Sequence, residues 1–297
     1  MVENIFKPEN VCAILVTYNP NISELKDNIK SVINYVDRIC LIDNSTDEFL
    51  QTDIMNFHSD FNIHVISNKN NLGIAYAQNQ GFDWAIEQGY DFFLLLDQDS
   101  KIEEDTVEKL LSTHKLLSVQ NKKVACVGPL AFDRDKTENS LYNNYGLDDN
   151  KVIEVSETLS SGSLISKEAI KEIGNMEEDL FIDLVDYEWC WRAKNKGYST
   201  FIARDVKLAH RLGEGRVGVS RFSIGIPSPI RHYYQFRNTL IMLRRPYVPK
   251  DFKVKYAGIL PIKFLFFLFF SKPRLLRIKF MIKGVVDGFI GKKGKYS

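Results

Sequence analysis

Asp97 and Asp99 are the residues of this chain whose type and spacing most directly suggest chemistry. They end an apolar run at 92–96 that is too short to cross a membrane and indicates a buried strand. Ligands of open α/β sheets bind beyond the carboxyl ends of strands, and two carboxylates one residue apart can share a hard divalent cation with substrate phosphates. The pattern predicts a site for Mg²⁺ or Mn²⁺ and a phosphate ester, unless the two residues are merely solvated.

A second acidic cluster lies far along the chain and contains Asp183, Asp186 and Glu188. Trp189 and Trp191 follow closely, and burial beside apolar rings raises the pKa of a carboxylate and makes it a useful general base. The alternative is an acid-rich first helical turn, which the helix dipole favours whatever the function. A protein with both clusters in one pocket could bind a phosphate ester and deprotonate a hydroxyl group.

Three further features could belong to such a site. His210 follows a probable strand, and imidazole is an acceptable ligand of manganese, although a lone histidine is more often structural. The Gly- and Arg-rich segment 213–225 lacks periodicity and is expected to be a lid over phosphates or a mobile loop. Arg231 and Arg237 stand at helical spacing, where they could reach diphosphate oxygens or belong to a packed helix.

These residues need a scaffold, and the chain predicts one. Strands are expected at 11–17, 38–43, 62–67 and 92–97, with helices between them, including one at 71–89. Such alternation predicts a mainly parallel, doubly wound α/β sheet of the Rossmann-like type. A helix at 103–119, strands at 123–128 and 159–166, a helix at 167–174 and an irregular excursion at 130–158 complete the expectation. The four cysteines lack metal-ligand spacing and are expected to be buried and reduced.

Charge divides the chain into two unequal parts. The 297 residues are 44% hydrophobic and carry a net charge of +1, but residues 244–297 hold fourteen Lys and Arg against two acidic residues. We therefore predict a catalytic domain at 1–245 and a basic, apolar helical tail at 246–297. Interleaved Phe, Leu and Lys favour an anionic membrane surface over nucleic acid; the alternative is a packing or dimerisation helix, and homo-oligomers stay possible. With no secretory signal apparent, we expect a cytoplasmic protein, peripheral at the inner face of the membrane.

Several motifs together resemble glycosyltransferase family 2, the inverting enzymes of the nucleotide-sugar-binding fold called GT-A. The resemblance covers roughly residues 11–240. Its parts are VTYNP at 16–20, IDNST at 42–46, NLGIAYAQN at 71–79, LLLDQDS at 94–100, SSGSLIS at 160–166, VDYEWCWRA at 185–193 and KLAH at 207–210. DQDS, and FID before VDYEW, look most like the bacterial rhamnosyltransferase subgroup.

The resemblance implies roles for individual residues. Those expected to contact the donor nucleotide, its base or its diphosphate are Thr17, Tyr18, Asn19, Asp43, Asn44, Asn71, Gly73, Asp97, Gln98, Arg231 and Arg237. Asp99 is the first expected metal ligand, with Asp97 and His210 beside it. The acidic pair that usually holds the family's base maps onto Val185 and Asp186, which leaves Asp186 as the base, with Glu188 and Asp183 as second choices.

By the same resemblance, the expected reaction moves L-rhamnose from dTDP-L-rhamnose to a hydroxyl of a lipid-linked saccharide, with inversion and a divalent metal, in cell-surface polysaccharide synthesis. A UDP-hexose donor is the main alternative. A phosphatase that uses Asp97 as nucleophile is disfavoured, because Ser100, Lys101 and Ile102 follow the acidic pair in place of Thr or Val and Gly. A non-catalytic module that binds sugar nucleotides is the remaining alternative.

Overall fold

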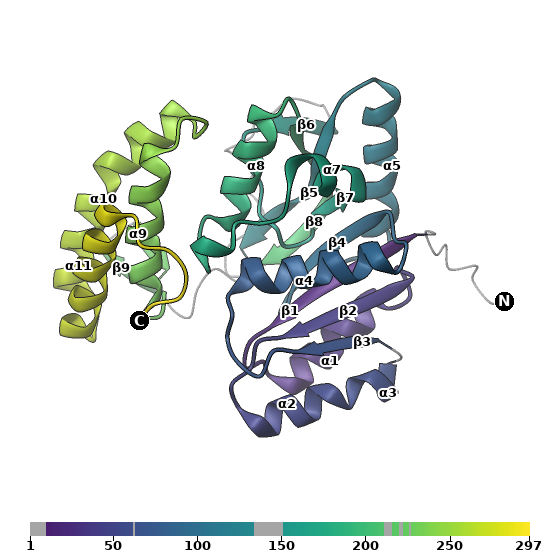
Figure 1. Cartoon of the computed structure of the whole chain (residues 1–297), viewed down its shortest axis with the longest axis horizontal. Helices are drawn as coiled ribbons and strands as arrows, with labels where there is room; N and C mark the ends of the chain where they lie inside the picture. The colour runs from purple at the N-terminus through teal and green to yellow at the C-terminus, as the bar shows by residue number, and fades with distance from the viewer. Residues whose placement is uncertain (1–9, 62, 134–150, 211–215, 220–221, 226) are drawn as a thin grey trace.

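Strands form the centre of the molecule, which a computed structural model describes over residues 10–61, 63–133, 151–210, 216–219, 222–225 and 227–297 (Figure 1). The strands are β1 Val11–Thr17, β2 Arg38–Asp43, β3 His64–Ser67, β4 Phe92–Asp97, β5 Val124–Asp133, β6 Val152–Val155, β7 Leu164–Ser166, β8 Ser199–His210, β9 Arg216–Val219 and β10 Phe222–Gly225.

Helices flank the sheet and continue beyond it. They are α1 Ile22–Val32, α2 Glu48–Met55, α3 Phe57–Phe61, α4 Ile74–Glu87, α5 Thr106–Val119, α7 Lys167–Ile173, the 3₁₀ turn η1 Glu178–Leu180, α8 Val185–Asn195, α9 Arg231–Arg244, α10 Lys250–Phe270 and α11 Arg274–Ile290. Side-chain caps fix several starts, as where Asn21 accepts from the backbone N–H groups of Ser23 and Glu24 at α1.

Eight of the described strands form one sheet in the order β3-β2-β1-β4-β7-β5-β8-β6. β1 pairs in parallel with β2 and β4, and β2 with β3, whereas β7 runs antiparallel to β4 and β5. Parallel strands need crossover connections, and the helices between them supply these. The predicted mainly parallel α/β sheet is confirmed, with β6 and β7 as its antiparallel members.

Apolar side chains cover both faces of the sheet, because alternate residues of each buried strand point to opposite sides. On one face Ile14 and Phe93 pack with the helices α4 and α8, including Trp189. On the other face Leu15 and Leu94 pack with α1 and α5. This double covering leaves the carboxyl ends of the strands as the place for polar groups.

The helices α9, α10 and α11 lie together beside the sheet and form what we call the three-helix unit (Figure 1). Gly284 and Gly288 let α11 approach α9 closely: a Cβ added at Gly284 would lie 2.5 Å from the carbonyl oxygen of Tyr233. The buried Asp287 accepts a 2.9 Å hydrogen bond from the Tyr233 hydroxyl. Because α9 belongs to the three-helix unit, this unit begins at Arg231, upstream of residue 245. The domain boundary expected at 245 stays a prediction.

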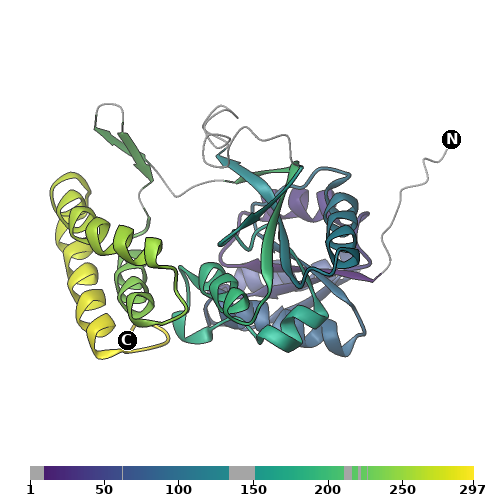
Figure 2. The ribbon, with the colours of Figure 1, turned by 90° about the horizontal axis from the view of Figure 1, so that it is seen from above.

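Two segments differ from their predicted form. The expected strand at 159–166 is a strand only over Leu164–Ser166, since the residues before it turn at Gly162, whose φ is +76°. The segment expected to be an aperiodic loop contains β9 and β10, an antiparallel pair that projects beside the three-helix unit (Figure 2). Most of the expected excursion, residues 134–150, lies outside the described residues.

Candidate active site

The carboxyl ends of β1, β2 and β4 meet at one edge of the sheet. Thr17 at the end of β1 is in register with Asp43 at the end of β2, and Val16 is in register with Asp97 at the end of β4. The backbone therefore brings together residues that are up to 81 positions apart in sequence. This edge is where an open α/β sheet binds its ligands.

Asp43 organises the first part of the site. Its Oδ1 accepts hydrogen bonds from the Thr17 hydroxyl at 2.9 Å and from the Ser45 hydroxyl and N–H at 2.6 and 3.0 Å. Ser45 in turn accepts from the N–H of Asn19. The other oxygen, Asp43 Oδ2, is buried without a hydrogen-bond partner among the described residues. A buried acceptor without a hydrogen bond costs free energy, so Asp43 Oδ2 indicates a position where a ligand could supply the donor.

The start of α4 forms the second part. Gly73 has φ +93° and accepts a 3.1 Å hydrogen bond from the side chain of Asn44, while its N–H donates to Asn71. A Cβ at Gly73 would lie 2.7 Å from the carbonyl oxygen of Phe181. Glycine is therefore required twice, by its conformation and by its close contact with the segment before α8.

The turn after β4 carries the paired carboxylates. The Ser100 N–H donates to the carbonyl of Asp97, and the Ser100 hydroxyl lies 2.5 Å from that of Ser161. Asn28 donates to the same Asp97 carbonyl from α1, at 2.9 Å. Gln98 accepts from the N–H of Tyr18 at 2.8 Å, which joins this turn to the end of β1.

Asp186, in the first turn of α8, faces the turn after β4. The pKa of its carboxyl is raised to about 6, chiefly by burial and to a smaller extent by the negative charge of Asp97, while backbone hydrogen bonds from Tyr187 and Ser160 act in the opposite direction. A charge acts in this way only at short range. Ser160 and Ser161 also link Asp186 to the turn that carries Asp97 and Asp99, because Ser160 bonds to Asp186 and the Ser161 hydroxyl meets that of Ser100.

The segment before α8 has an unusual backbone. Phe181, Asp183 and Leu184 all have positive φ, between +65° and +67°, a conformation that costs side-chain-bearing residues of the order of 1 kcal/mol each. The fully buried Asn238 of α9 holds this segment by donating to the carbonyls of Leu180, Ile182 and Asp183 at 2.8–3.0 Å. Strain maintained by dedicated contacts is typical of functional segments.

Two acidic residues near Asp186 are engaged elsewhere. Asp183 forms an ion pair with Arg231 at 2.5 Å. Glu188 is fully buried and bonded to Arg192 at 3.0 Å, Arg245 at 3.2 Å and the Tyr247 hydroxyl at 2.6 Å. These partners occupy the lone pairs of both carboxylates, whereas Asp186 accepts hydrogen bonds only from backbone groups in the described structure.

Arg237 is likewise fully buried. Its guanidinium donates to the carbonyls of Leu180 at 2.9 Å and Asp179 at 3.1 Å, and to that of Gly294. These contacts give it a structural environment next to the strained segment. Arg231 is more exposed, and through Asp183 it also lies beside that segment.

The residues expected to bind a metal can be compared with the needs of the ion. Asp97 and Asp99 are both partly exposed at the end of β4, and they offer the hard oxygen ligands that Mg²⁺ and Mn²⁺ accept. Among the described side chains, no group of three or more His, Cys, Asp or Glu residues forms a metal cluster. One or two carboxylates completed by substrate phosphates suffice for Mg²⁺, so this donor set fits. The side chain of His210 lies outside the described residues.

Sequence reasoning did not single out Asn28, Ser45, Ser161 or Asn238. The first three support Asp43 and the turn after β4, and Asn238 supports the segment before α8. Ser45 and Ser161 lie inside the IDNST and SSGSLIS motifs, which could have drawn attention to them. Nothing in the pattern around Asn238 distinguishes it from an ordinary helical residue.

The fold and the site define a class of protein, and comparison with known proteins gives the family. Residues 12–174 match the family model described as Glycosyl transferase family 2, which is more than half of the chain. The chain is also 32% identical over 295 residues to the dTDP-rhamnosyl transferase RfbF of Shigella flexneri, covering 96% of this chain and 97% of that protein. This chain belongs to glycosyl transferase family 2, and it is a glycosyltransferase, as predicted.

Solved structures show the same fold at low sequence identity. The mannosyltransferase PcManGT from Pyrobaculum calidifontis, in complex with GDP-Man and Mn²⁺, matches 97% of this chain and 88% of its own, with a TM-score of 0.57 and 16% identity. GalNAc-T7 with UDP, GalNAc and Mn²⁺ matches 86% of this chain with a TM-score of 0.55 and 15% identity, and this chain spans 55% of its length. The predicted GT-A fold is confirmed.

Proposed function

We propose that this glycosyltransferase moves L-rhamnose from dTDP-L-rhamnose to a hydroxyl group of a lipid-linked saccharide, with inversion at the anomeric carbon. One observation carries the chemistry: Asp186 accepts a backbone hydrogen bond from Ser160, and the hydroxyl of the adjacent Ser161 meets that of Ser100 in the turn that follows Asp97. The similarity to RfbF over nearly its whole length supports the choice of donor.

Asp186 is the proposed general base. As the acceptor oxygen attacks the anomeric carbon, the Asp186 carboxylate takes the hydroxyl proton, and the bond from that carbon to the diphosphate oxygen breaks. A pKa of about 6 leaves the carboxylate largely deprotonated at neutral pH, yet more basic than an ordinary aspartate. Because the acceptor attacks directly, no covalent glycosyl-enzyme and no second flanking carboxylate are needed.

Asp43 and Gly73 are proposed to hold the nucleotide. Thymine and uracil carry a ring N–H at N3, and Asp43 Oδ2 is an acceptor for which the described residues supply no donor. The backbone at Gly73, where no Cβ intrudes, allows close approach of the nucleoside. Thymine and uracil share that N–H, so discrimination between dTDP and UDP falls to contacts with the base methyl group and the ribose 2′ position.

Asp97 and Asp99 are proposed to hold Mg²⁺ or Mn²⁺ together with the donor diphosphate. Bound there, the ion supplies Lewis-acid stabilisation of the negative charge that the leaving diphosphate gains. The protein prepares for this by fixing the turn through Asn28, Ser100 and Ser161, so that the carboxylates need not reorganise.

The basic tail supports the proposed acceptor and location. No helix in the described part of the chain combines the length and apolar content that a membrane crossing requires. The concentration of Lys and Arg after 244 supports a peripheral position at the inner, anionic face of the cell membrane, where a lipid-linked saccharide for cell-surface polysaccharide would be available.

A donor screen tests this proposal. The purified full-length chain is heated with dTDP-rhamnose, dTDP-glucose, UDP-glucose or UDP-N-acetylglucosamine, each with Mg²⁺, with Mn²⁺ and with a chelator. We expect the largest stabilisation with dTDP-rhamnose and metal, and slow release of dTDP. Selective response to a UDP-hexose would replace the donor, equal responses to both dTDP sugars would remove the sugar assignment, and stabilisation unaffected by the chelator would remove the metal.

A further inference from the structure

The outer surface of the three-helix unit is unusually apolar. Nineteen large apolar side chains are exposed among the described residues, and eleven of them lie between Val254 and Ile290. A helix that packs on its own domain normally buries its apolar side chains and exposes its polar ones. So many exposed apolar side chains on α10 and α11 depart from that pattern. Exposed apolar patches of this kind mark interaction sites.

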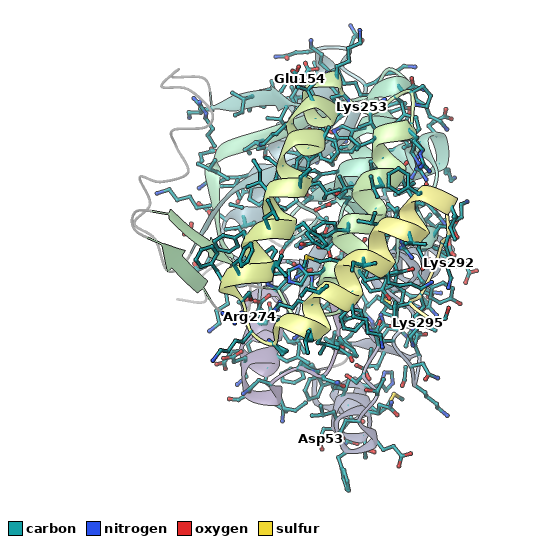
Figure 3. The ribbon with its side chains drawn as sticks, turned by 90° about the vertical axis from the view of Figure 1, so that its left-hand side faces the viewer. Asp53, Glu154, Lys253, Arg274, Lys292 and Lys295 are labelled. Atoms are coloured by element: carbon teal, nitrogen blue, oxygen red, sulfur yellow. The ribbon has the colours of Figure 1, made fainter. Side chains whose placement is uncertain are left out.

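Part of this surface is hollow. A groove of about 670 Å³ opens between α10 and α11, with α9 as its floor, and all of its lining side chains are apolar. They include Phe236 and Leu240 of α9, Leu260 and Phe264 of α10, and Val285 and Phe289 of α11. Figure 3 shows α10 and α11 diverging from the turn at Arg274 toward Lys253 and Lys292, with α9 behind them. We call this cavity the tail groove.

Four exposed apolar side chains gather at the closed end of the V formed by these helices. Residues 269–276, which we call the tail turn, carry Phe269 and Phe270 on one side and Leu275 and Leu276 on the other, with Leu275 85% exposed. Lys272 and Arg274 lie between the two apolar pairs and are exposed as well. Apolar tips interleaved with cations suit an interface between hydrocarbon and anionic headgroups.

Charge decides between the possible occupants of this surface. Residues 244–297 carry a net charge of +12, whereas the preceding part of the chain carries −11. A second copy packed on the same face would bring two strongly positive surfaces together, which costs free energy. Nucleic acid matches the charge, but its phosphates offer no apolar surface to Phe269 or Leu275. An anionic bilayer satisfies both properties at once.

We propose that the three-helix unit docks on an anionic phospholipid bilayer through the tail turn, and that the tail groove receives one hydrocarbon chain. Phe269, Phe270, Leu275 and Leu276 enter the headgroup region, while Lys272 and Arg274 contact lipid phosphates. This deepens the proposed function and rests on it for its purpose, because a lipid-linked acceptor is confined to that surface. The docking itself requires neither donor nor acceptor.

Vesicle co-sedimentation of the full-length chain tests the proposal. We expect binding to vesicles of phosphatidylcholine mixed with phosphatidylglycerol, and much weaker binding to phosphatidylcholine alone. The quadruple variant Phe269→Ser, Phe270→Ser, Leu275→Ser, Leu276→Ser should lose at least tenfold in vesicle affinity. Lys272→Glu should lose roughly fivefold or more on the anionic vesicles, since each cation near such a surface contributes about that factor.

The chain offers a matched control for each variant. Phe49, Met55, Leu116 and Val119 are comparably exposed in the sheet domain, and their replacement by Ser should leave vesicle binding unchanged. Lys115→Glu, at an exposed position of α5, controls for the charge reversal. A photoreactive phosphatidylglycerol whose acyl chain carries the probe should label tail-groove residues such as Phe264 and Val285.

Specific results would overturn the proposal. Equal vesicle binding by the tail-turn and control variants would contradict docking through the tail turn. A lipid-free dimer that the tail-turn variant abolishes would instead make the surface a dimer interface. RNA binding that this variant abolishes, in the absence of vesicle binding, would make it a nucleic-acid site. Labelling outside the tail groove would remove its role. The dTDP-rhamnose thermal shift, measured without vesicles, should be the same in all variants, so failure of docking and failure of the donor assignment are distinguishable.

Discussion

The strand ends bury polar side chains, whereas the three-helix unit exposes apolar ones. Around Asp43, a buried carboxylate is surrounded by the hydroxyl and N–H groups of neighbouring strands and loops. Around the tail turn, phenylalanine and leucine side chains stand in solvent beside exposed cations. The first region has arranged its polar groups before a small ligand arrives, and the second has left apolar surface for a large partner.

The two regions therefore depend on different partners, small molecules at the strand ends and an extended surface at the three-helix unit. In the proposed reaction, the site at the strand ends requires a donor, an ion and an acceptor hydroxyl, and its side chains are already held. The three-helix unit exposes apolar side chains, for which we propose a bilayer as the covering surface. Asn238 connects the two, since it lies on α9 and holds the segment that leads to Asp186.

The largest effect is expected at the base. Asp186→Asn should lower kcat roughly 100- to 10,000-fold, the range for loss of a general base, because no carboxylate would then take the acceptor proton. Donor binding, read from the thermal shift, should be retained. Glu188→Gln and Asp183→Asn each break an ion pair, so neither is a neutral control, and Glu104→Gln, at an exposed carboxylate, serves instead. Full activity of Asp186→Asn would move the chemistry elsewhere.

The next effect concerns the metal site. Asp99→Asn should lower transferase activity roughly 100-fold and make donor binding insensitive to a chelator, because an amide is a weaker ligand than a carboxylate for a hard cation. Glu104→Gln, an exposed carboxylate shortly after the same strand, should change neither. Unchanged metal dependence in Asp99→Asn would show that other groups hold the ion.

The pH profile should report Asp186 directly. With its pKa raised to about 6, kcat/KM should fall about tenfold between pH 7 and pH 5 as the base becomes protonated. The sign for stability is opposite: a raised carboxyl pKa means that the folded state binds the proton more tightly, so this group's contribution to stability declines as pH rises from about 4 to 6. Asp186→Asn should abolish both trends, and a flat profile in the parent protein would contradict the assignment.

A smaller effect is expected where the two regions join. Asn238→Ala removes three hydrogen bonds to the segment before α8, so Asp186 should be held less accurately and kcat should fall roughly tenfold. KM for the donor should stay nearly the same, which a general loss of structure would not produce. Thr239→Ala, the buried neighbour, is the control, and equal kcat in both variants would deny Asn238 a positioning role.

The smallest effect concerns packing within the three-helix unit. Gly284→Ala places a methyl group 2.5 Å from a backbone oxygen of α9, so it should destabilise the protein by about 1–3 kcal/mol. Gly258→Ala, on exposed α10 with no atom within 4 Å, should instead stabilise it by about 0.5–1 kcal/mol. Urea unfolding compares the two variants. Equal effects would mean that α11 is not seated on α9 as described.

Much of the sheet was predictable because its strands are continuous apolar runs that end in polar residues. β2 spans Arg38–Asp43 and β4 spans Phe92–Asp97, as predicted. The predicted helix at 71–89 is α4 over Ile74–Glu87, since the positive φ of Gly73 prevents an earlier start. The buried, unpaired state of Cys12, Cys40, Cys126 and Cys190 is also confirmed.

The rest of the site depends on contacts that periodicity does not encode. Positive φ at Phe181, Asp183 and Leu184 cannot be read from residue types that normally avoid it. Glu188 forms an ion pair with Arg245, which lies 57 positions away in sequence. Periodicity cannot reveal such a distant partner, so the sequence alone left Glu188 as a candidate base. β9 and β10 escaped prediction because Gly and Arg weaken the alternation that indicates strands.

The close seating of α11 on α9 has a practical consequence for anyone who wishes to shorten this protein. Cutting the chain after 245 would remove α11 and strip the cover from Tyr233, a side chain with no exposed surface, and would take away the Gly294 N–H that donates to the carbonyl of Asp179 at 2.7 Å. A truncated enzyme with low activity would thus report damage next to the base as readily as lost attachment to lipid. Point changes at the surface are the cleaner tool.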